Sequence, residues 1–122
     1  MMIERIWNQV APGVFQRRYD PLDISVGAVL GGHGVTIIDT RNNEREAREI
    51  IDEAAAQFGL PIVAVINTHA HYDHTFGNQL FAQQGIPIYG HHRIYAHFER
   101  FEKRRLELVR RSPELEPDMD WD

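Results

Sequence analysis

The sequence contains no cysteine among its 122 residues. Disulfide bonds and thiolate ligands are therefore excluded, and any bound metal ion has to be held by imidazole and carboxylate groups. No apolar run reaches the length of about 18 residues that spans a membrane, and residues 1–6 lack the apolar core of a signal peptide. From these absences we expect a cytoplasmic protein without a membrane partner.

Positive charge is also scarce, since 13 Lys and Arg residues stand against 18 Asp and Glu residues and the net charge is −5. This acidic balance argues against nucleic acid as a partner. Hydrophobic residues make up 43% of the chain and charged residues 25%, which is typical of a soluble globular domain. We expect one domain over residues 1–111, followed by an acidic, disordered tail over residues 112–122.

The hydrophobic pattern predicts an α/β (α+β) fold with a mixed sheet. An N-cap pair, Asn43 and Glu46, starts an amphipathic helix that runs to Gly59. A β-branched run over residues 62–66 follows, and it is typical of a strand buried on both faces. The other predicted strands are a pair around Pro12-Gly13, residues 24–30 and 35–38 around a glycine turn, and residues 86–89; the other predicted helices are residues 75–84 and 93–111. The mixed charges of residues 93–111, Glu102 among them, suggest a solvated face.

The chemistry of the chain is concentrated in residues 67–78, directly after the β-branched run. Three imidazoles and a carboxylate fall within six residues there, as His69, His71, Asp73 and His74. Two residues apart on an extended chain, His69 and His71 point to the same side and can share one ion. Asp73 and His74 follow after a turn and can serve a second ion. The pattern predicts a binuclear metal site at the carboxyl end of a strand, where α/β sheets bind ligands.

Residues 67–78 resemble the His-x-His-x-Asp-His signature of the metallo-β-lactamase superfamily. Upstream, residues 36–40 resemble the first motif of that family, a strand that ends in an Asp, here Asp39. The resemblance covers residues 10–95 and the amino-terminal half of the family's domain. It implies half of an αββα sandwich, with a mixed sheet and helices on one face, so that residues 1–111 would form a truncated domain.

The resemblance also implies roles for the motif residues. His69 and His71 would bind one zinc ion, Asp73 and His74 would bind another, and Asp39 would steady the motif loop. Asp73 would in addition hold and orient the water or hydroxide that attacks the substrate. We expect zinc as the metal, although iron and manganese also suit imidazole and carboxylate ligands.

Further metal ligands would come from the second half of the family's domain. After the motif this sequence offers only His91, His92 and His97, none in a Gly-His-Thr-like context. Two functions therefore stay open. One is a hydrolase of a small-molecule substrate with an ester, thioester, amide or similar bond, and the other is a truncated, non-catalytic metal-binding or interaction half-domain. In either case the chain could pair with a second copy or with a complementing second half.

Overall fold

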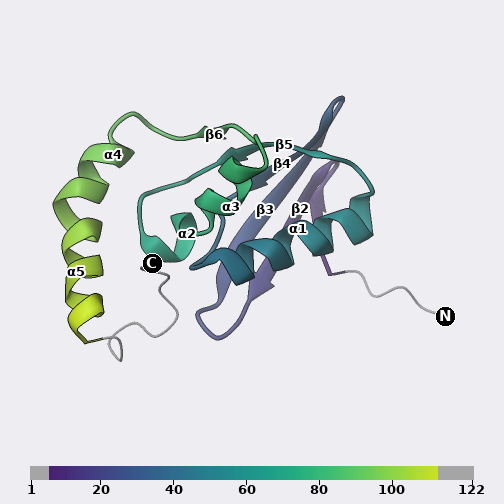
Figure 1. Cartoon of the computed structure of the whole chain (residues 1–122). Helices are drawn as coiled ribbons and strands as arrows, with labels where there is room; N and C mark the ends of the chain where they lie inside the picture. Colours follow the sequence, from purple (N-terminus) through teal and green to yellow (C-terminus); the bar gives the residue numbers. More distant parts are fainter. Residues whose placement is uncertain (1–5, 113–122) are drawn as a thin grey trace.

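The computed structural model describes residues 6–112, which form a mixed sheet with helices on one face (Figure 1). The strands are β1 (Asn8–Ala11), β2 (Val14–Tyr19), β3 (Ile24–Gly31), β4 (Gly34–Ile38), β5 (Ile62–Ile66) and β6 (Ile88–Tyr89). The helices are α1 (Glu44–Phe58), α2 (Tyr72–Thr75), α3 (Asn78–Gln83), α4 (Ile94–His97) and α5 (Lys103–Arg111), with a π-helical segment η1 (Phe98–Glu102) between α4 and α5. The predicted fold class is confirmed.

The strands lie in the sheet in the same order as in the chain. β1 to β4 are antiparallel, and both predicted turns, at Pro12-Gly13 and at residues 31–34, join neighbouring strands. β4, β5 and β6 are parallel, and the helix α1 makes the crossover that parallel neighbours require. The carboxyl ends of β4, β5 and β6 therefore meet at one edge of the sheet, which is where the histidine motif begins.

Helix α1 has the ends that the sequence predicts. The Asn43 side chain accepts a hydrogen bond of 2.9 Å from the backbone N–H of Glu46, and this bond satisfies one free donor of the first turn. Gly59 ends the helix with a φ of 63°, a left-handed conformation that glycine adopts without strain. Between these caps Ala47, Ile50 and Ala54 are buried against the sheet.

The hydrophobic core lies between the sheet and the helices α1 and α3. Ala28, Ile37 and Val65 are neighbours across β3, β4 and β5 and are fully buried on this face. Leu80 and Phe81 of α3 complete the same core. Helix α3 thus fixes the segment that follows the histidine motif against the body of the domain.

The opposite face of the sheet is open in the described part of the chain. Ile38, Ile66 and Tyr89 are neighbours across β4, β5 and β6 on this face, and the last two are 42% and 59% exposed. The prediction that residues 62–66 are buried on both faces is therefore wrong. A continuous β-branched run has no alternation, so it cannot distinguish a doubly buried strand from one with an exposed apolar face.

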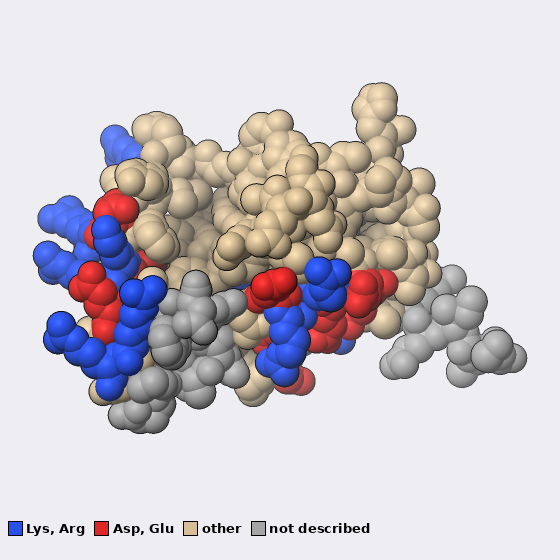
Figure 2. Space-filling model, in the orientation of Figure 1, with Lys and Arg blue, Asp and Glu red and all other residues tan. Residues whose placement is uncertain are grey.

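Two predicted helices have interruptions. Of the helix expected over residues 75–84, only α3 forms, and α2 ends at Thr75 before it. Between α2 and α3 the backbone at Gly77 lies so close to Thr40 that a Cβ atom there would be 2.1 Å from the Thr40 carbonyl oxygen. The helix expected over residues 93–111 contains the π-helical segment η1. Figure 2 shows Lys and Arg side chains mixed with Asp and Glu over this second helix.

The predicted acidic tail lies almost wholly outside the described residues, which end at residue 112. Over residues 6–112, no helix combines the length and the apolar character that crossing a membrane requires.

Candidate metal centre

The structure brings the four motif residues together at the carboxyl end of β5. His69 and His71 lie in the loop after the strand, and Asp73 and His74 lie on α2. The ligand atoms of His69, His71 and Asp73 are all within 4.8 Å of one another. The ring of His69 also lies 4.3 Å from the ring of His74, measured between centroids. The four side chains predicted to bind metal therefore form one cluster.

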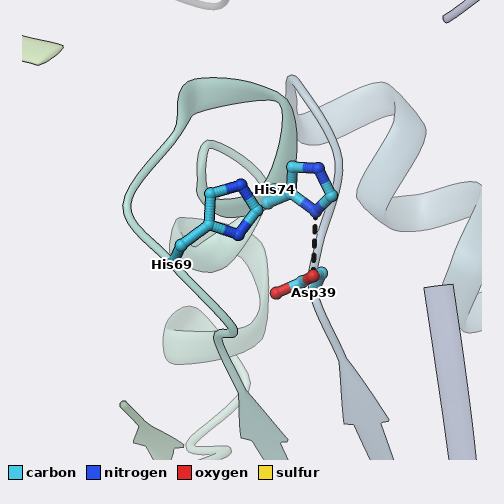
Figure 3. Close-up of side chains that lie close together, drawn as sticks. All are labelled: Asp39, His69 and His74. Atoms are coloured by element: carbon cyan, nitrogen blue, oxygen red, sulfur yellow. Dashed lines mark hydrogen bonds and ion pairs between the residues drawn. The ribbon is translucent and has the colours of Figure 1, made fainter. Parts of the chain in front are cut away.

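Asp39 ties this loop to the end of the neighbouring strand β4. One of its carboxylate oxygens accepts a hydrogen bond of 2.8 Å from the Thr68 backbone N–H. The other accepts a bond of 2.7 Å from the Thr68 hydroxyl. It also accepts a bond of 2.8 Å from His74 Nδ1, which Figure 3 shows. Asp39 is buried, and its φ of 71° lies in the left-handed region that Asp adopts more readily than most residues.

The bond to Asp39 fixes the tautomer of the neutral His74 ring. Because a carboxylate only accepts hydrogen bonds, the neutral ring carries its proton on Nδ1 and keeps the lone pair on Nε2. Carboxylate partners of this kind orient metal-binding histidines in many proteins. The arrangement leaves His74 with one nitrogen suited to a metal ion.

The surroundings move the pKa values of two histidines in opposite directions. The hydrogen bond to Asp39 raises the pKa of His74 above its ordinary value. Burial, together with the neighbouring His74 and His71, lowers the pKa of His69. The lowered pKa favours the neutral form of His69, which is the form that binds metal.

Two amide side chains frame the motif, a feature that sequence reasoning missed. Asn67 and Asn78 exchange hydrogen bonds of 3.1 and 2.6 Å through their side-chain amides. Thr40 donates a bond of 2.8 Å to Asn78 Oδ1, and its backbone N–H donates to the His74 carbonyl. The signal available in the sequence was an Asn at each end of the motif. The hydrogen bonds between these two side chains close the loop.

The later histidines separate into two groups. His91 and His92 are exposed and stack on each other, and His91 Nδ1 accepts a bond of 3.1 Å from the Arg93 N–H at the start of α4. His97 instead points toward the motif, with its ring 5.8 Å from that of His71. Glu102, expected on the solvated face of the helix, is buried beside them. The expectation of a solvated face is therefore wrong at this residue, because the carboxyl-terminal helix lies against the motif loop.

A cavity of about 490 Å³ opens beside the motif. Its walls come from the motif loop and α3 on one side and from the carboxyl-terminal helix on the other, with Asn67, Ala70, Phe76, Phe98 and Leu106 among them. Apolar walls with a few polar groups are typical of small-molecule sites.

Residues 19–121 match the family model described as the metallo-beta-lactamase superfamily. The chain belongs to the metallo-β-lactamase superfamily. The resemblance seen in the motif residues is thus confirmed over most of the chain. Two solved structures share the fold. The metallo-β-lactamase of Erythrobacter litoralis, with β-mercaptoethanol in its active site, has a TM-score of 0.62 at 20% identity, and that of Hirschia baltica has 0.64 at 22%.

One curated relative has a higher sequence identity to this chain than the two solved structures have, but over a shorter stretch. The hydroxyacylglutathione hydrolase of Gloeobacter violaceus is 46% identical over 50 residues, which are 39% of this chain and 19% of the relative. The two structural matches each cover 77% of this chain, but only 45% and 47% of the matched proteins. This superfamily member therefore spans less than half the length of the proteins it matches.

Proposed function

We propose that this chain carries the metal-binding motif of a metal-dependent hydrolase that acts on an ester, thioester, amide or similar bond. The observation that carries the proposal is the cluster of His69, His71, Asp73 and His74 at the end of β5. Membership of the superfamily supports it. The name of the Gloeobacter relative favours a thioester among these bonds.

The donor set fits zinc. Imidazole nitrogens and carboxylate oxygens are zinc ligands, and catalytic zinc sites use them in threes. His69 and His71 would hold one ion, and Asp73 and His74 would take part in holding a second. Bound zinc supplies a Lewis acid that lowers the pKa of water to about 7.

The other residues of the site position these groups. Asp39 keeps the His74 ring turned so that Nε2 is available, and the Asn67–Asn78 pair holds the ends of the loop. Asp73 is half-buried, with Oδ1 3.8 Å from His74 Nε2, where it can accept a hydrogen bond from the attacking water and orient it. The cavity beside the loop would receive the apolar part of the substrate.

One observation favours a second candidate function, a non-catalytic half-domain. The apolar face formed by Ile38, Ile66 and Tyr89 is open in the described part of the chain. A face of this kind is typical of a surface that pairs with another chain. In this alternative the motif binds metal and the activity belongs to an assembly with a second half.

The test is turnover of a hydroxyacylglutathione thioester by the zinc-loaded chain, beside ester and amide substrates. We expect Asp73→Asn to lower the rate by at least about 100-fold, since a positioned carboxylate contributes roughly 10²–10⁴ in rate. His92→Ala is the matched control, because His92 is exposed and outside the cluster. Equal rates for the Asp73 variant and the wild type would contradict the hydrolase. Zinc binding without turnover of any substrate would favour the half-domain.

A further inference from the structure

A second group of metal-ligand side chains lies where the carboxyl-terminal helix meets the motif loop. His71, His97 and Glu102 place one ligand atom each within 4.8 Å of the others. His71 Nε2 is 3.9 Å from Glu102 Oε1. All three side chains line a cavity of about 330 Å³, together with Phe101 and Arg105. The cavity leaves room for an ion and a small ligand between the two segments.

Glu102 carries the strongest indication that something binds here. Its side chain is only 4% exposed, and its Oε2 is buried without a hydrogen-bond partner among residues 6–112. Burying a carboxylate oxygen without a partner costs folding free energy, because the oxygen loses its hydrogen bonds to water and forms none within the protein. A cation between Glu102 and the two imidazoles would satisfy it.

The backbone of the helix explains how His97 and Glu102 come to face the same cavity. On an α-helix, residues five apart differ by about 140° in direction, given 3.6 residues per turn. The segment η1 begins directly after His97 and ends at Glu102, and the Lys103 N–H donates a hydrogen bond to the Phe98 carbonyl, five residues back. This wider turn brings residues 97 and 102 nearer to one face, and π-helical turns are frequent at functional sites.

We propose that His71, His97 and Glu102 form a further zinc site, beside the two ions that the motif predicts. Two imidazoles and a glutamate are a known zinc ligand set that leaves a position open for water or substrate. His71 is shared with the motif: its Nε2 faces this helix site, 3.9 Å from Glu102 Oε1, and its Nδ1 remains for the ion that it would hold with His69.

The experiment is zinc titration of the metal-free full chain by isothermal titration calorimetry, with zinc content after dialysis measured by mass spectrometry. We expect His97→Ala and Glu102→Gln each to hold one zinc ion fewer than the wild type, or to bind it more than about tenfold more weakly. His92→Ala should match the wild type, since it removes an exposed histidine outside both groups.

Two further variants and measurements make the outcome decisive. His74→Ala should lose the ion that Asp73 and His74 would hold and keep the helix ion, so a failure of the motif site and a failure of the helix site give different results. Glu102→Gln keeps the size of the side chain, so it decides the question if His97→Ala unfolds. Wild-type zinc content and affinity in a folded Glu102→Gln variant would overturn the proposal.

Discussion

Among single residues, Asp39 has the most connections to the site, since its carboxylate accepts three hydrogen bonds from Thr68 and His74. Asp39→Asn keeps the size of the side chain but replaces one hydrogen-bond-accepting oxygen with an NH₂ group, which can only donate. We expect zinc affinity to fall by about 10–100-fold, as for other carboxylates behind metal-binding histidines. Competition with a chromogenic chelator measures this. Asp52→Asn on the exposed side of α1 is the control, and equal affinities for the two variants would contradict the role given to Asp39.

Tyr19 gives a pH-dependence that is independent of metal. Burial and the 2.7 Å hydrogen bond to Glu53 raise the pKa of Tyr19 well above its usual value near 10. In alkali the unfolded chain therefore releases this proton before the folded chain does. The stability from Tyr19 is present below about pH 10 and is lost above it, by up to about 1.4 kcal/mol per pH unit.

The comparison that checks this is urea unfolding of Tyr19→Phe and the wild type at about pH 8 and pH 11. The variant should be the less stable protein at the lower pH, where it lacks the bond to Glu53. It should lose less stability than the wild type on going to the higher pH. Tyr95→Phe, at an exposed position, should leave the wild-type slope unchanged. Parallel pH profiles for Tyr19→Phe and the wild type would rule out a raised pKa at Tyr19.

At the level of elements, the joint between α2 and α3 holds the motif against the core. Gly77 has the close approach already described, to the Thr40 carbonyl and also to Ala47 of α1, and a backbone atom cannot move aside as a flexible side chain can. We expect Gly77→Ala to destabilise the fold by about 1–3 kcal/mol, the usual cost of overpacking. Gly32→Ala is the control, because a Cβ atom at Gly32 meets no atom within 4 Å. Chemical denaturation measures the stability of both variants. Equal midpoints would show that α3 can shift away from Thr40 and Ala47 to make room for the methyl group.

The elements also show what sequence can predict. The ends of α1 follow from Asn43 and Gly59 because caps are local signals, read within one turn of the helix. The position of the motif after β5 could be predicted for a similar reason, since the prediction depends only on recognising the strand that directly precedes the motif. Burial of Glu102 depends instead on how the carboxyl-terminal helix lies against the loop, a long-range contact that mixed charges on the helix do not reveal.

The same distinction applies to the exposed face of β5. Its residues are apolar whether the face is covered or open, so composition alone predicted burial. The partners of Asp39 show the intermediate case. The Asp could be expected near the motif because β4 and β5 are parallel, but its three hydrogen bonds depend on the exact path of the loop.

For the whole molecule, the open sheet face is the feature with the largest consequence. Ile38, Ile66 and Tyr89 form a row of apolar side chains, which ends on the short edge strand β6. Burying such a face gains about 25 cal/mol per Å² of apolar surface, and unpaired strand edges also promote association. We therefore expect the isolated chain to self-associate through this face, with a weight-average mass that rises with protein concentration in sedimentation equilibrium.

The variant Ile66→Asp tests whether this face is the contact. A charge in the middle of the row would have to be buried without a partner on association, so the variant should stay monomeric over the same concentrations. Leu108→Asp is the matched control, since Leu108 is also apolar and exposed but lies on α5, away from the sheet face. Chelator in both samples keeps bridging by metal ions out of the comparison. A wild-type chain that sediments as a monomer throughout would contradict the predicted self-association. Association that survives Ile66→Asp and is lost with Leu108→Asp would place the contact elsewhere.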